Sequence, residues 1–203
     1  MPLLANRRVV LRLAAGAFAG LAAVHAQAAD GPAAALIEKV AAQVIELVKT
    51  KTGPEREAGI RQVLEQSFDL PYMAQQALAT HWNETNADQR QRFLKAVVSS
   101  EAHAYAERFG QYGGQTLTVG RVIQRPGNVS IVQSKLNQTN GQPINIDWEV
   151  RDNGQGLRIS DVKIEGVSMV MTRRSDFNSY ISGHGGQVDA LISELEARAK
   201  AAR

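Results

Sequence analysis

The sequence predicts an α+β fold in which a helical first half packs on an antiparallel sheet. Up to about residue 113, apolar residues recur every three or four positions, which is the period of an amphipathic helix. From about residue 114 to residue 174 they recur at every second position, as in a strand. Helices and strands thus occur in two blocks and do not alternate. This order favours an antiparallel sheet with one face covered by helices.

The N-terminal segment 1–28 has the pattern of an export signal. A basic start precedes an apolar run over residues 13–24, and Ala26-Gln-Ala28 is a small-residue cleavage site. About a dozen apolar residues are too few for a helix to cross a bilayer. The basic residues are Arg7, Arg8 and Arg12. They resemble a twin-arginine export signal, and both this route and the general one stay open.

Removal of this segment leaves a chain without net charge. The full chain has 23 basic and 20 acidic residues, and no acid precedes Asp30. Loss of the three arginines therefore leaves 20 basic residues against 20 acidic ones. Nucleic-acid binding requires a basic surface. Nucleic acid is therefore excluded as a partner.

The chain also lacks the residues that common active sites need. It has no cysteine, which excludes disulfides, thiolate metal sites and a cysteine nucleophile. His81, His103 and His184 do not have the spacing of metal ligands, so no metal or cofactor is expected. The mature chain is long enough to fold around an apolar core without disulfides.

Four helices are expected in the first half. Pro32, Pro54 and Pro71 each stand at the start of a helix, where the missing backbone N–H costs nothing. Asn86-Ala-Asp-Gln89 has the spacing of a capping box and begins the longest helix, which should end at a C′ glycine, Gly110. The apolar positions include Leu36, Ile37, Val40, Val44, Leu47, Ile60, Val63, Leu64, Leu78 and Trp82.

Three strands are expected to follow. Short alternating stretches lie at 116–119 and 129–132, and the clearest strand is Ile144–Val150. In this strand Asp147 and Glu149 lie on the face opposite Trp148. The two carboxylates are on the polar face, so a solvated surface is favoured over acid–base catalysis.

The next stretch joins the sheet to the last helices. A fourth strand is expected over residues 157–164, and its apolar phase slips near Ser160–Asp161, which predicts a β-bulge. A further strand is expected over residues 167–172, with Ser175 as the N-cap of the helix after it. Gly183-His-Gly-Gly186 should end that helix before a final one. Ser168 lacks the second glycine of a nucleophile elbow.

The mature chain 29–203 is expected to be one domain. It would consist of a helical part at 29–113, a sheet part at 114–174 and C-terminal helices at 175–203.

The remaining candidate site is apolar. Its side chains are expected on the inner sheet face and on the facing helices. They are Phe68, Tyr72, Met73, Phe93, Leu94, Val97, Tyr105, Phe109, Ile146, Trp148, Met169 and Met171. A filled core and a hollow one have the same composition, so both stay open. Arg173 and Arg174 could hold an anionic head group, or they form a solvated pair at a strand end.

Several stretches resemble a known family over essentially the whole mature chain. They are Phe68-Asp-Leu-Pro-Tyr-Met73, Thr80-His-Trp82, Tyr112-Gly-Gly-Gln-Thr116 and Glu165-Gly-Val-Ser-Met-Val-Met-Thr172, with Phe177 and Tyr180. Together they resemble the MlaC family of periplasmic phospholipid carriers, also called toluene-tolerance proteins. The region from Phe68 to Trp82 is similar to the HpnM branch, which is associated with hopanoid biosynthesis.

The resemblance implies a cystatin-like sheet and a deep apolar cavity between sheet and helices. It implies a soluble periplasmic carrier, expected as a monomer, that buries a phospholipid's acyl tails with the head group outward. The carrier would move lipid between an outer-membrane lipoprotein complex and an inner-membrane ABC transporter complex. A cavity at or beyond the upper end of about 1,000 Å³ for ligand pockets is expected for this task. A hopanoid ligand and the direction of transport stay open.

Two other classes of function also stay open. An isomerase or hydratase on a cystatin-like fold would need an ionisable side chain inside the cavity. A pure adaptor would have a solid core and no lipid.

The export pattern predicts a mature N-terminus at Ala29. The intact mass of the protein recovered from the periplasm should correspond to residues 29–203, because the small-residue site lies directly before Ala29. A cytoplasmic product that keeps Arg7 to Arg12 would show that the segment is not an export signal.

Overall fold

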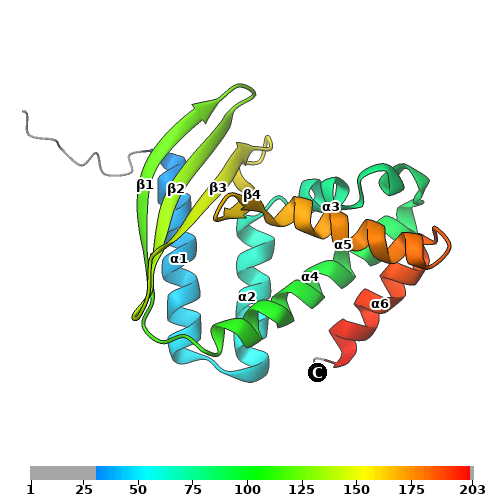
Figure 1. The fold of residues 1–203 in the computed structure, drawn as a ribbon, viewed down its shortest axis with the longest axis horizontal. Helices are drawn as coiled ribbons and strands as arrows, with labels where there is room; N and C mark the ends of the chain where they lie inside the picture. Colours follow the sequence, from blue (N-terminus) through cyan, green and yellow to red (C-terminus); the bar gives the residue numbers. More distant parts are fainter. Residues whose placement is uncertain (1–30, 202–203) are drawn as a thin grey trace, which may run out of the picture.

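The computed structural model describes residues 31–201, and the predicted export segment lies outside the described residues. The chain begins with four α-helices and a short 3₁₀ helix, continues through five strands, and ends with two α-helices (Figure 1). The helices are α1 (Pro32–Thr50), α2 (Gly53–Ser67), α3 (Leu70–Leu78), η1 (Ala79–Glu84), α4 (Ala87–Phe109), α5 (Met169–Gly183) and α6 (Val188–Ala201). None of these helices is both long and apolar enough to cross a membrane.

The strands form one antiparallel sheet in the order β1-β2-β3-β4-β5. They are β1 (Thr116–Arg125), β2 (Val129–Asn137), β3 (Ile144–Asp152), β4 (Leu157–Ile164) and β5 (Val167–Ser168). The α+β prediction and the antiparallel sheet are confirmed. The predicted bulge is also confirmed, because Val150 pairs with Ile159 while Glu149 pairs with Asp161. A second irregularity between Val119 and Val122 in β1 was not predicted.

The helices divide into two groups around the sheet. In Figure 1, α1 and α2 run beside the sheet, whereas α3, α5 and α6 lie at the opposite end of the molecule, and α4 connects the two groups. Two main core clusters follow this division. One joins α1 and α2 to the sheet around Ile37, Val132 and Ile159. The other joins the four helices α3, α4, α5 and α6 around Phe93 and Ile192.

The helix starts agree with the expected capping chemistry. The Asn86 side chain accepts from the Gln89 N–H at 2.9 Å, and the Gln89 side chain accepts from the Asn86 N–H at 3.0 Å. This is the predicted capping box. Helix α4 ends at Phe109 as expected, but Gly110 keeps a right-handed conformation with φ −58°. Gly110 is therefore the C-cap and not the left-handed C′ residue that was predicted.

The prediction of a strand over residues 167–172 is wrong. Strand β5 has only two residues, and α5 begins at Met169, six residues before the predicted cap at Ser175. The N-cap is Ser168, whose hydroxyl accepts from the Met171 N–H at 3.1 Å. The carboxylate of Asp161 accepts from the Val170 N–H at 3.2 Å and from the Val162 N–H at 2.8 Å. A negative charge at this end of the helix also complements its dipole.

The contacts of Asp161 predict that its removal destabilises the protein. Asp161→Ala should lower the free energy of unfolding by roughly 2 kcal/mol, because two N–H groups lose a buried, charged acceptor. Asp147→Ala, on the polar face of β3, is the control and should stay within about 0.5 kcal/mol of wild type. Urea denaturation monitored by circular dichroism measures both. Equal losses in the two variants would contradict the role assigned to Asp161.

Candidate functional site

An apolar cavity of about 440 Å³ lies between the sheet and the helices. Residues of α1, α2, α3, α4, β2, β3, β4 and α5 line it, so almost every element of the fold contributes to the wall. The volume falls within the usual range of ligand pockets, about 300–1,000 Å³. It is well below the upper-end volume that was expected, and bulky side chains such as Phe68, Phe93 and Phe177 are part of the lining.

Most of the predicted site residues meet in this cavity. Nine of them line the wall: Phe68, Met73, Phe93, Val97, Tyr105, Phe109, Ile146, Trp148 and Met169. They come from both halves of the chain. The fold therefore brings the predicted apolar residues of the helices and of the sheet to one place.

Three predicted residues do not line the cavity. The Tyr72 ring lies under the Arg151 guanidinium, with 4.9 Å from its central carbon to the ring centroid, and Leu94 packs on the core cluster of α3 to α6. Met171 is 51% exposed. In a strand, Met169 and Met171 would share a face, but in a helix residues two apart point in widely different directions. The early start of α5 therefore separates them.

Other wall residues were expected only as helix core. Val40 and Val44 from α1, and Ile60, Val63 and Leu64 from α2, also line the cavity. Their helical period was visible in the sequence, but the period does not distinguish a side chain that faces a hollow from one in a filled core.

The polar group of Trp148 is satisfied within the protein, whereas Tyr105 lies in a desolvated part of the wall. The indole N–H of Trp148 donates to the Ser134 hydroxyl at 2.9 Å, and that hydroxyl donates to the Ile146 carbonyl at 2.9 Å. The Tyr105 ring stacks on Phe109 with centroids 5.8 Å apart. Burial raises the pKa of Tyr105, and Glu101 raises it further. The surroundings of Tyr105 therefore disfavour its charged form.

Three charged side chains also line the cavity, namely Glu101, Arg108 and Arg173. Arg173 donates to both carboxylate oxygens of Glu101, at 2.6 and 3.0 Å, and this pairing raises the pKa of the Arg173 guanidinium. The carboxylate that an enzyme of this fold would need is thus present, but its two oxygens are held by an arginine. This pairing does not favour acid–base catalysis.

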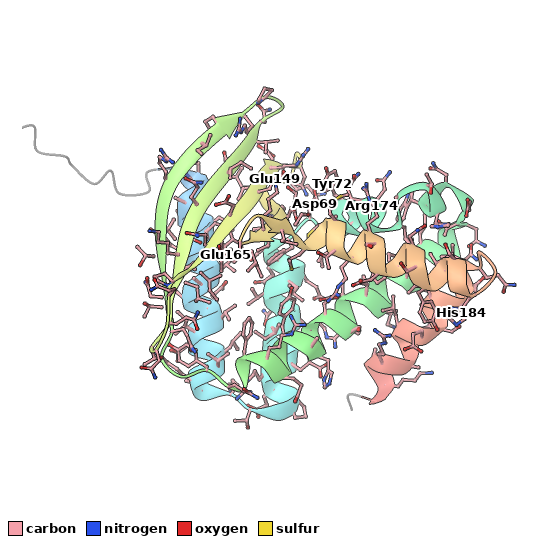
Figure 2. The ribbon with its side chains drawn as sticks, viewed as in Figure 1. Asp69, Tyr72, Glu149, Glu165, Arg174 and His184 are labelled. Carbon is pink, nitrogen blue, oxygen red and sulfur yellow. The ribbon has the colours of Figure 1, made fainter. Side chains whose placement is uncertain are left out.

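Arg174, the second predicted head-group residue, lies away from the cavity. Its guanidinium donates to the Gln76 carbonyl at 2.8 Å, which ties α5 to α3. Figure 2 shows Arg174 and Tyr72 beside α3, on the edge of α5 that faces away from α4. Only Arg173 of the predicted pair lines the cavity.

The other candidate catalytic residues have structural contacts. Glu149 accepts from Ser160 and Arg151, both at 2.9 Å. His81 bonds to Glu84 at 3.0 Å, which raises the pKa of His81, and also to Asn178. No group of three side chains among residues 31–201 could hold a metal ion.

An exposed apolar patch adjoins the cavity at the turn between β4 and β5. Its members are Ile164, Val167 and Met171, with exposed fractions of 38%, 56% and 51%. Ile164 also lines the cavity, as does the neighbouring Met169. Apolar surface therefore continues from the cavity to the outside at this turn.

Comparisons with known proteins agree with this geometry. The family model described as "MlaC protein" matches residues 38–197. A phospholipid-binding protein from Ralstonia solanacearum, solved in complex with a phospholipid, has a similar structure with a TM-score of 0.71. It is 23% identical, and the match covers 85% of this chain and 99% of that one, which shows a shared fold. No curated protein matches the chain.

Burial of Tyr105 predicts late ionisation of its hydroxyl. Its phenol should stay protonated above the ordinary pKa of 10.0, because the wall does not solvate the phenolate. The stabilisation from this shift is present below pH 10 and is lost as pH rises through the raised pKa. Ultraviolet titration of wild type minus Tyr105→Phe isolates this group. A midpoint at or below 10 in the difference curve would show a solvated site.

Proposed function

The chain belongs to the MlaC family, and from this premise we propose that it is a periplasmic carrier that binds a phospholipid by its acyl tails. The observation that carries the proposal is the apolar cavity between the sheet and α4. The fold that the chain shares with a protein solved with a phospholipid supports the same ligand class.

The energetics of lipid extraction explain why such a cavity is needed. Two acyl tails that leave a membrane expose roughly thirty methylenes, at about 0.8 kcal/mol each. A carrier must therefore offset on the order of 20 kcal/mol, which requires enclosure of the tails and not only contact with a surface.

The cavity volume requires some movement of the wall when a whole lipid binds. About 440 Å³ is small for two tails, but Met73 and Met169 are unbranched side chains that repack readily. Their places on α3 and α5 let the wall adjust on the side opposite α1 and α2.

The carrier role implies which membrane complexes would be the partners of the protein. We infer that the protein receives and delivers lipid at an outer-membrane lipoprotein complex and an inner-membrane ABC transporter complex. The expected export segment and the absence of a membrane-spanning helix among residues 31–201 are compatible with this role. The protein would not be an enzyme, because Glu101 is paired with Arg173.

Charge placed in the cavity should prevent lipid binding. Met169→Glu puts a carboxylate against the tails, and the protein should then purify without phospholipid. Ser175→Glu is the matched control, since Ser175 lies on the same helix, is exposed and does not line the cavity. It should retain lipid. Native mass spectrometry of proteins purified from a Gram-negative bacterium measures both.

The outcomes separate a hollow site from a solid core. A folded, lipid-free Met169→Glu protein supports the carrier. An unfolded Met169→Glu chain, together with a lipid-free wild type, would show a solid core and contradict the proposal. Mass analysis of the extracted ligand distinguishes a phospholipid from a hopanoid, and a hopanoid would replace the proposed ligand class.

A further inference from the structure

A second hollow lies next to the cavity, in a groove between α4, α5 and α6. Its volume is about 520 Å³. Phe177, Leu191 and Leu195 give it an apolar floor, whereas Ser100, Asp176 and Arg198 are polar members of its lining. This mixed lining differs from the almost wholly apolar wall of the cavity and is suited to a ligand group that is itself polar.

The groove and the cavity share one wall. Glu101, Arg108, Arg173 and Phe177 line both hollows. Glu101 and Arg108 are seven residues apart on α4, so they lie on the same side of that helix. The charged side chains of α4 and α5 therefore stand where the apolar cavity meets the mixed groove.

Within this shared wall, Arg108 is the cation that is not neutralised. Arg173 is bonded to Glu101 and to Asp176, and Arg198 of the groove is bonded to Glu194 at 2.7 Å. Among the ion pairs of residues 31–201, none includes Arg108. Arg108 also lies in the last turn of α4, where a cation interacts favourably with the helix dipole. That role does not use the hydrogen-bond donors of the guanidinium.

We propose that the groove receives the polar head of the bound lipid and that Arg108 contacts its phosphate at the boundary between the two hollows. The proposal rests on the carrier function, and it adds the place and the partner of the head group. A guanidinium presents several N–H donors in a planar fork, which matches phosphate oxygens. The tails would lie in the cavity and the head group in the groove, on the two sides of the boundary that Arg108 lines.

The assignment also replaces Arg173 and Arg174 as the head-group residues. Arg173 already has a carboxylate partner, and Arg174 bonds to Gln76 beside α3. Arg108 was not selected from the sequence, because it is one of several arginines on an amphipathic helix. Its distinguishing feature is that it lines both hollows and, unlike Arg173, belongs to none of the ion pairs among residues 31–201, which only the fold reveals.

Phosphorus NMR of the protein loaded with phosphatidylglycerol tests the proposal. In Arg108→Ala the resonance of the bound phosphate should move from its wild-type position. Lipid transfer from protein to vesicles should accelerate by about tenfold, the effect expected from loss of one charge-assisted hydrogen bond. Arg108→Lys should give a resonance position and a transfer rate between those of wild type and Arg108→Ala, because lysine keeps the charge but not the planar fork. The control is Arg121→Ala, an exposed arginine of β1 that bonds to Gln133 and should behave as wild type.

Each result has a definite meaning. If wild type binds phosphatidylglycerol and Arg108→Ala shows the same resonance and transfer rate, Arg108 does not hold the head group. If wild type binds no phospholipid, the carrier function itself fails, and this is seen before any Arg108 variant is measured. Inorganic phosphate is also added to lipid-free Met169→Glu protein, with and without Arg108→Ala, and its phosphorus resonance should be the same in both. A resonance of inorganic phosphate that depends on Arg108 would show a free-phosphate site and overturn the proposal.

Discussion

The carboxylate of Asp161 joins the sheet to helix α5, and the shape of the cavity depends on this contact. One oxygen accepts from the Val162 N–H within β4 and from the Val170 N–H in the first turn of α5. The bulge at Ser160 gives Asp161 its position in β4. With the helix start set in this way, Met169 lines the cavity, while Met171 is exposed at its edge. A start at Ser175 would have placed both methionines on one strand face.

The Arg173–Glu101 ion pair has a different role from that of an enzyme's acid and base. It connects α5 to α4 across the boundary between the cavity and the groove, with two hydrogen bonds that satisfy the carboxylate. Because both side chains are partly exposed, the pair is expected to add little to overall stability. Its effect is to remove free charge from the cavity wall. This leaves Arg108, at the same boundary, as the cation available to an anionic ligand group.

Much of the fold could be predicted from the sequence, because its helices and its longest strand have clear periods and caps. The capping box at Asn86 and the bulge at Ser160 were both visible in the residues. The stretch from Met169 to Thr172 was not, since a short apolar run fits a strand or a helix equally well. A carboxylate eight residues before Met169 decides between them. For the site, nine of the twelve candidate apolar residues line the cavity, but whether they enclose a hollow required the structure, since periodicity does not report empty volume.

The central claim is that acyl tails occupy the cavity, and Trp148 on its wall can report their presence directly. The chain has two tryptophans, and Trp82 packs on the cluster formed by helices α3, α4, α5 and α6 and does not line the cavity. In a Trp82→Phe variant, the fluorescence therefore comes from Trp148 alone. Loading with a phospholipid brominated along its tails should quench this emission strongly, whereas the same lipid without bromine should not. Equal emission with the two lipids, at equal bound amounts, would show that the tails lie elsewhere and would contradict the account.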